Sequence, residues 1–135
     1  INIYILNLML TKNEIFALSL VEGVGSKSIQ NIINANISIN DFDVSSLTQA
    51  IKGPKKKIAI DQILNNFEKF LDMAELSIIN LREENINLIS CLDSEYPESF
   101  SNIHDKPIFL FAKGNLDLLN HNKSVAVVGS RKCSS

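Results

Sequence analysis

Apolar residues recur at helical spacing through the first part of the chain. A first helix is predicted over residues 11–22, where Thr11 and Glu14 have the spacing of a capping box. A second helix is predicted to begin at Ser26, whose hydroxyl can cap it. The apolar positions that define the inner faces of these helices are Ile15, Leu18, Val21, Ile29, Ile32 and Ile33.

Shorter elements follow, and then a long one. Residues 38–42 and 45–51 are predicted as two small helices, each opened by a serine, and Gly53-Pro54 ends the second. Residues 55–84 keep helical spacing throughout, either as one unusually long helix or as two helices broken near residues 72–77. Residues 1–84 are therefore predicted to form an all-α domain, with 1–10 an extension whose status the pattern leaves open.

The pattern changes to strand-like runs from residue 85 onward. Residues 86–90 and 108–111 are predicted strands, separated by a turn at Tyr96-Pro97, and residues 116–119 are a short helical turn. Residues 124–128 form a third predicted strand, apolar from Val125 to Val128, as in a strand buried on both faces of a parallel sheet. The expected fold class is α/β, with residues 85–135 as the incomplete beginning of a Rossmann-like domain.

Aromatic residues in this second part are predicted to be structural. Strand spacing assigns Phe109 and Phe111 to the core, and Tyr96, directly before Pro97, is expected to pack beneath the sheet edge. Base stacking is the alternative role for these three rings.

Composition and charge narrow the functional classes. The 135 residues carry 13 basic and 15 acidic side chains, a net charge of −2, so any nucleic-acid binding must depend on placed groups rather than a broad positive field. Cys91 and Cys133 lack metal-site spacing and indicate a reduced, cytoplasmic protein. Residues 1–10 are too short to span a membrane. His104 and His121 have no partner at catalytic spacing, so no catalytic residue, metal or cofactor is predicted.

A candidate phosphate site follows the third predicted strand. Gly129 lets the backbone approach a phosphate, Ser130 supplies a hydroxyl and an N–H, and Arg131 can hold two phosphate oxygens. A purely structural strand–turn is the alternative. The short Gly129-Ser130-Arg131 sequence is not a dinucleotide fingerprint, because no further glycines follow at the required spacing.

A second candidate site is the turn between the first two helices. Gly23 and Gly25 flank an apolar residue, as in a helix-hairpin-helix, where backbone N–H groups hold a DNA phosphate, and Lys27 adds a positive charge. The alternative is a structural or protein-binding hairpin within a SAM-like helical domain, since Glu22 lies beside the turn. Residues 55–57, three consecutive lysines, are interpreted as a solvated charge run or as an accessory nucleic-acid contact.

Residues 86–135 closely resemble the DprA/Smf family of DNA-processing proteins, and the helical part resembles it more loosely. The residues that carry the resemblance are Tyr96, Pro97, Pro107, Leu110, Lys113, Gly114, Leu118, Leu119 and the run Val125–Arg131. One departure is Phe100, where leucine is commoner in the family.

The resemblance implies a non-enzymatic protein that binds single-stranded DNA during natural transformation and loads the RecA recombinase. It also implies a SAM-like domain followed by a Rossmann-like domain through which the protein dimerises. Gly129, Ser130 and Arg131 map to the family's phosphate pocket. The rest of the DNA site, the dimer surface and the RecA surface are expected beyond Ser135.

Two other functions stay open at this point. Rossmann-like phosphate pockets also occur in nucleotide-processing enzymes that resemble phosphoribohydrolases, although their glycine-rich loops are absent from these residues. A helical protein-interaction module without a nucleic-acid role is the third hypothesis. The sequence leaves undecided whether the organism is transformable and whether the helical domain binds DNA or protein.

Overall fold

The predicted capping box forms at the start of the first helix. In the computed structural model, which describes residues 9–121 and 123–129, the Glu14 N–H donates to Thr11 Oγ1 at 3.2 Å. Glu14 Oε2 in turn accepts from the Thr11 N–H at 2.8 Å. Helix α1 therefore begins at Lys12 and continues to Leu20 (Lys12–Leu20). It ends earlier than predicted because Val21 adopts an extended backbone.

The second helix, α2 (Ser26–Asn34), begins at the predicted place but with a different cap. Gly25 is the N-cap residue, and no side chain hydrogen-bonds to the helix start. The prediction that Ser26 caps this helix is therefore wrong, because Ser26 already has helical backbone geometry. Ile29 and Ile32 are buried as predicted, and Ile33 packs partly buried against the same core.

The two small helices form, but only one is opened by a serine. The 3₁₀ helix η1 (Ile39–Asp41) follows Ser38. Helix α3 (Val44–Ala50) is capped instead by Asp43, whose carboxylate accepts from the Ser46 N–H at 2.6 Å. A carboxylate at the positive end of a helix is a stronger cap than the predicted serine at position 45, since charge adds to the hydrogen bond.

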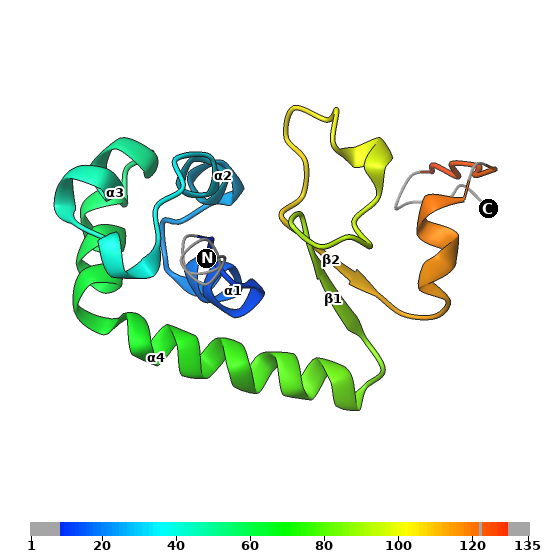
Figure 1. Ribbon diagram of the computed structural model, residues 1–135, viewed down its shortest axis with the longest axis horizontal. Coiled ribbons are helices and arrows are strands. Elements are labelled where there is room, and N and C mark those ends of the chain that lie inside the picture. The colour runs from blue at the N-terminus through cyan, green and yellow to red at the C-terminus, as the bar shows by residue number, and fades with distance from the viewer. Residues whose placement is uncertain (1–8, 122, 130–135) are drawn as a thin grey trace, which may run out of the picture.

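The long helix α4 (Lys56–Glu83) has a kink at Asn66, where the backbone is non-helical, and it has no break near residues 72–77, so the expected position of the break is wrong. Asn66 has a φ of −136° and a ψ of 18°, which separates the helix into a shorter part before it and a longer part after it. Residues on either side of the expected break stay on one buried face, including Phe70, Ala74 and Ile78. Burial of that face stabilises a helix longer than propensity alone supports. Figure 1 shows α4 running along one side of the molecule, from α3 to the sheet.

The first two predicted strands are confirmed and pair with each other. Strand β1 (Asn87–Ser90) runs antiparallel to β2 (Phe109–Ala112), with Asn87 opposite Ala112 and Ser90 opposite Phe109. The 3₁₀ helix η2 (Glu98–Phe100) lies in the connection between them, and η3 (Leu116–Asn120) follows β2. The chain is thus mixed α/β, as expected, while the specific SAM-like and Rossmann-like domain types stay predictions.

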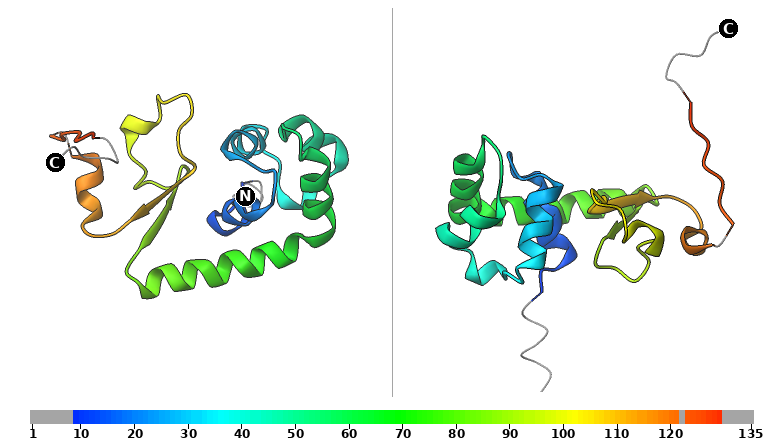
Figure 2. Two further views of the ribbon diagram at one scale, coloured as in Figure 1. Left: turned by 180° about the vertical axis from the view of Figure 1, so that it is seen from behind. Right: turned by 90° about the horizontal axis from the view of Figure 1, so that it is seen from above.

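The third predicted strand does not form. Residues 124–128 are extended without strand pairing, and Val125, Val127 and Val128 are at least 90% exposed. Figure 2 shows this segment projecting from the body of the molecule. A strand requires a neighbour for its N–H and C=O groups, and no described segment lies alongside this one. The prediction of burial on both faces is therefore wrong for the described chain.

The two strand phenylalanines differ in burial. Phe109 packs against the core as predicted, with its ring 5.3 Å from that of Phe16 in an edge-to-face arrangement. Phe111 is 59% exposed, which contradicts its predicted core position. Residues 109 and 111 alternate with 110 along a short two-stranded sheet, and the helices cover only part of the face to which Phe111 belongs.

The hydrophobic core runs through both predicted domains without interruption. Leu88 and Ile108, from the strand-containing part, belong to the same buried cluster as Ile15, Leu18 and Ile78 from the helices. The sheet therefore packs on α1 and α4 rather than forming a separate core. The domain boundary near residue 84 stays a prediction from the sequence.

An ion pair adds to this packing. Lys12 Nζ lies 2.7 Å from Asp93 Oδ2 and also donates to the Leu88 carbonyl at 2.9 Å. Asp93 accepts a further hydrogen bond from the Ser90 N–H at 2.8 Å. Partial burial alone would raise the pKa of Asp93, but the hydrogen bond and charge of Lys12, with the Ser90 N–H, hold it below its usual value. The start of α1 is thereby tied to the end of β1.

Replacing Asp93 by Asn is expected to lower the free energy of unfolding at neutral pH by about 1 kcal/mol, the range of a half-exposed ion pair with one hydrogen bond. Because the folded-state pKa is lowered, the stabilisation is present above the ordinary value of 3.8 and is lost as pH falls through the folded value. Denaturant unfolding of both proteins across this pH range measures the difference. Asp105→Asn, at an exposed position, is the control. A deficit that is independent of pH would contradict the electrostatic origin.

Candidate nucleic-acid interface

The turn between α1 and α2 is built around Gly23. This residue has a φ of +90°, a backbone conformation that other residues rarely adopt. A Cβ at this position would lie 2.8 Å from the Lys55 Cβ and 3.1 Å from the Lys55 carbonyl oxygen. Val21 and Val24 on either side are buried and anchor the turn. Glycine is therefore required both for the turn and for the close approach of the segment that contains Lys55.

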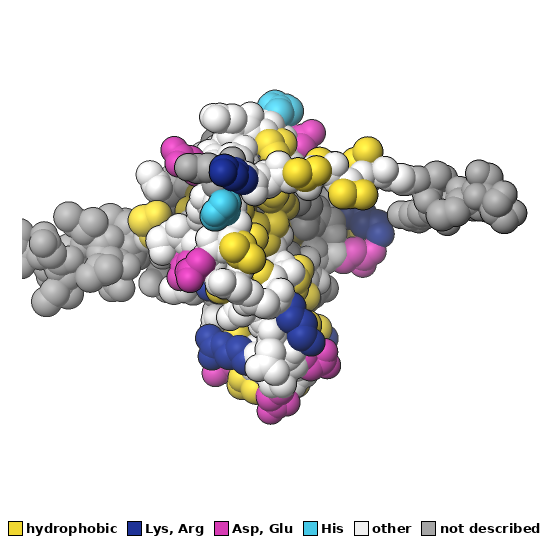
Figure 3. Space-filling model, turned by 90° about the vertical axis from the view of Figure 1, so that its right-hand side faces the viewer, with side chains coloured by type: hydrophobic (Ala, Val, Ile, Leu, Met, Phe, Trp, Pro, Cys, Tyr) yellow, Lys and Arg dark blue, Asp and Glu magenta, His cyan; other side chains and the backbone are white. Residues whose placement is uncertain are grey.

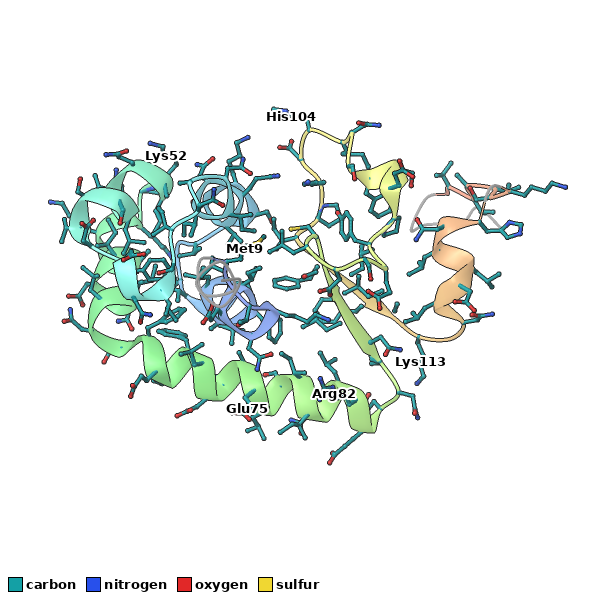
Figure 4. The ribbon with its side chains drawn as sticks, in the orientation of Figure 1. Met9, Lys52, Glu75, Arg82, His104 and Lys113 are labelled. Carbon is teal, nitrogen blue, oxygen red and sulfur yellow. The ribbon has the colours of Figure 1, made fainter. Side chains whose placement is uncertain are left out.

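The segment 52–57, between α3 and α4, lies directly against this turn. Besides the contact at Gly23, the Lys52 N–H donates to the buried hydroxyl oxygen of Ser28 at 3.2 Å. The sequence patterns at 23–27 and 55–57 had no evident relation, and the fold brings them together. We call residues 22–28 and 52–57 together the hairpin surface. Figure 4 marks Lys52 at the end of the molecule where α2 and α3 lie.

The start of α2 contributes backbone donors to the hairpin surface. The first intrahelical bond runs from the Ile29 N–H to the Gly25 carbonyl at 3.1 Å, so the N–H groups of residues 26–28 lie outside the helical ladder. Ser26 and Lys27 are both exposed. Donors of this kind at the positive end of a helix favour an anionic group such as a phosphate.

The hairpin surface is positively charged. It contains five lysines and one glutamate: Lys27, Lys52, Lys55, Lys56, Lys57 and Glu22. Glu22 forms an ion pair with Lys55, and the hydrogen bond and charge from Lys55 lower the pKa of Glu22. The glutamate beside the hairpin, which argued against a DNA contact, is thus paired with one lysine and leaves four others. Lys52 is a residue that sequence reasoning missed, because it lies outside both motifs.

The second candidate site lies at the other end of the chain. Gly129 is exposed, and nothing lies within 4 Å of the position a Cβ would take. Ser130 and Arg131 lie outside the described residues, so the phosphate site at 129–131 stays a prediction from the sequence. Figure 3 shows hydrophobic side chains along the arm that leads to this end, consistent with the exposed valines.

Tyr96 has a structural role, as its position before Pro97 predicted. Its hydroxyl donates to the Pro107 carbonyl at 2.6 Å, and its ring packs edge-to-face on Phe100 with centroids 6.0 Å apart. Burial, followed by the nearby Cys91, raises the pKa of the Tyr96 hydroxyl. The tyrosine therefore closes the connection between β1 and β2 rather than presenting its ring for base stacking.

Other reactive groups form no further constellation within residues 9–121 and 123–129. Burial raises the pKa of the Cys91 thiol, which favours the less reactive protonated form. His104 and His121 are both exposed. In this part of the chain no group of His, Cys, Asp and Glu is arranged to hold a metal, and no helix has the length and apolar character to cross a membrane.

Comparison with known proteins places a family match on the strand-containing part. The model of the family described as DNA recombination-mediator protein A matches residues 87–135. The DNA processing protein DprA of Streptococcus pneumoniae is 62% identical over 45 residues, which are 33% of this chain and 16% of that protein. The DNA processing protein DprA of Bacillus subtilis is 31% identical over 77 residues, 57% of this chain and 26% of that protein.

These relatives are much longer than the segments they share with this chain, which cover at most about a quarter of their length. No solved structure matches the chain. The family model covers β1, β2 and the Val125–Arg131 run, the same region that carries the sequence resemblance.

Proposed function

We propose that the protein carrying this chain binds single-stranded DNA and loads a RecA-type recombinase during natural transformation. The basis is the similarity of residues 87–135 to the DNA recombination-mediator protein A family and to proteins named DprA. The family indicates DNA processing in recombination. The observation that carries the finer proposal is the match over residues 87–135, which includes Gly129, Ser130 and Arg131. In this proposal the three residues form a phosphate pocket, and the protein acts as a homodimer.

The proposed role is binding rather than catalysis. The rival interpretation, a phosphoribohydrolase-like enzyme, gains no support from the comparisons, since the family model and both curated relatives are DNA-processing proteins by name. A bare protein-interaction module is likewise less consistent with that match. Single-stranded DNA as ligand also fits an arginine-centred pocket, because phosphate contacts bind without regard to base sequence.

We further assign an accessory role to the hairpin surface, which would contact the DNA backbone outside the main pocket. Its support is the juxtaposition of the α2 amide groups with Lys27 and Lys52, both exposed. The net charge of −2 makes such local clustering necessary, since the chain as a whole does not attract DNA.

The overall proposal is tested with the complete protein in two assays. A fluorescence-anisotropy titration with oligo-dT and with a mixed-sequence strand is expected to give similar affinities, both exceeding that for duplex DNA. RecA ATPase activity on strands covered by a single-strand-binding protein is expected to rise when the protein is added. Hydrolysis of a nucleoside monophosphate to base and ribose phosphate, without DNA binding, would overturn the proposal in favour of the enzyme.

The accessory contact makes a separate prediction. Replacing Lys27 and Lys52 together by Ala is expected to lower the salt dependence of binding by about one unit of slope per lost phosphate contact, equally for all base sequences. Lys113→Ala is the matched control, since Lys113 is exposed and lies toward the other end of the molecule (Figure 4). An equal loss in the control would show a general charge effect and would contradict an accessory site on the hairpin surface.

A further inference from the structure

The outer face of α4 carries an apolar stripe. Met73, Leu76 and Ile79 are 44%, 61% and 45% exposed, although Phe70, Ala74 and Ile78 on the opposite side of the same helix are buried. Figure 1 shows that α4 lies at the edge of the molecule, and the exposure of the three side chains places them on its outer face. Three large apolar side chains on one helix face form a small docking surface. None of the residues assigned to DNA binding lies on it.

Two charged residues of opposite sign flank the stripe symmetrically. Lys69 and Glu83 each lie seven residues from Leu76, which is two helical turns or about 10.5 Å along the axis. At 100° per residue, positions 69, 76 and 83 fall on the same side of the helix. Both charged side chains are exposed, and neither forms an ion pair within residues 9–121 and 123–129.

The charged and apolar positions on this face of α4 match those of a second α4 only when the two helices are antiparallel. When a second α4 lies antiparallel with the two Leu76 side chains facing each other, Lys69 of each copy faces Glu83 of the other, and Met73 faces Ile79. In a parallel pair, lysine would face lysine and glutamate would face glutamate, which is repulsive. A twofold axis through Leu76 thus satisfies both the apolar and the charged positions.

We propose that two copies of the protein associate through the α4 stripe in an antiparallel arrangement centred on Leu76. This contact is separate from the dimer contact proposed for the Rossmann-like domain, and it does not depend on the DNA-binding proposal. A single helix pair buries less than the roughly 1,600 Å² of a standard interface, so the contact is weak by itself. It would join dimers formed elsewhere into larger assemblies at high local concentration.

Disulfide cross-linking of the complete protein tests the geometry, in a background whose native cysteines are replaced by serine. Leu76→Cys is expected to cross-link with itself under mild oxidation. Lys69→Cys and Glu83→Cys are expected to cross-link when mixed, but not when either is oxidised alone. Arg82→Cys, exposed on another side of α4 and marked in Figure 4, is the control. Cross-linking of Leu76→Cys no faster than the control, or of Lys69→Cys with itself, would overturn the proposal.

Charge reversal gives a second measurement that leaves the core unchanged. Lys69→Glu or Glu83→Lys alone places like charges opposite each other and is expected to weaken self-association about threefold to tenfold, as for two surface ion pairs. The double reversal restores opposite charges and is expected to restore the association. Sedimentation equilibrium at low salt measures all four proteins. Failure of the double variant to recover would overturn the antiparallel pairing.

Discussion

Replacing Arg131 by Ala in the complete protein is expected to weaken single-stranded-DNA binding by about 1–3 kcal/mol, the range of a charge-assisted hydrogen bond. Arg131 supplies the one full positive charge in the Gly129-Ser130-Arg131 sequence. Its planar guanidinium can hold two phosphate oxygens, a geometry that lysine does not reproduce, so Arg131→Lys is expected to recover only part of the loss. Folding is expected to change little, because an arginine that binds DNA in the proposed pocket is open to solvent in the free protein, and replacing such a residue has a small effect on stability.

The measurement is a titration of each variant with oligo-dT and with a mixed-sequence strand at several salt concentrations. The loss is expected to be the same for both strands, because phosphate contacts do not distinguish bases. The salt slope is expected to become shallower by about one unit. Lys132→Ala, at the next position along the chain, is the matched control. Unchanged affinity in folded Arg131→Ala would remove this residue from the site and withdraw the residue-level support for the DNA-binding proposal.

The second large effect is expected at Gly23. Gly23→Ala is expected to lower the free energy of unfolding by about 1–3 kcal/mol, because alanine is strained at a φ of +90°. The added Cβ would also lie 2.8 Å from the Lys55 Cβ, so segment 52–57 must shift. That shift separates the two parts of the hairpin surface, and the accessory DNA contact is therefore expected to weaken in the same variant.

Two other glycines separate these causes. Gly53 has a φ of +113° with nothing within 4 Å of its Cβ position, so Gly53→Ala tests backbone strain without a clash. Gly25 has a φ of −92°, and nothing lies within 4 Å of its Cβ position, so Gly25→Ala introduces neither backbone strain nor a clash. This change of the N-cap residue is expected to lower the free energy of unfolding by less than about 1 kcal/mol. Denaturant unfolding is expected to show the largest loss of stability for Gly23→Ala, a smaller one for Gly53→Ala and the smallest for Gly25→Ala. A loss at Gly23 no greater than that at Gly25 would contradict the role assigned to the turn.

Local patterns in the sequence were sufficient to predict most elements. The capping box at Thr11 and Glu14 depends on residues three positions apart, so its hydrogen bonds can be anticipated from spacing alone. The apolar periodicity of α4 likewise depends only on which positions must be buried. The resemblance over residues 87–135 was also visible in the sequence, and the family match confirms it.

The predictions of burial that failed were those that depended on distant neighbours, whereas the wrong helix caps at residues 26 and 45 were local errors. Val125–Val128 has the composition of a buried strand, yet without a neighbouring strand in the described chain it stays exposed. Phe111 fits the strand pattern of a core residue, but the helices cover Phe109 on the same side of the sheet more completely than they cover Phe111. In both cases burial depends on what packs against a residue, and sequence periodicity carries no information about the partner.

By itself, the sequence determined most of the helices, the first two strands, the mixed α/β class and the similarity of residues 87–135 to the DNA recombination-mediator protein A family. These follow from short-range spacing and from motifs in a fixed order. Only the tertiary structure decided that Lys52 and Lys55 lie against the Gly23 turn and that Glu22 forms an ion pair with Lys55 there. It also decided that Lys12 pairs with Asp93. These residues are tens of positions apart, and their contacts arise because burial of the common core fixes α1, α2 and α4 against one another.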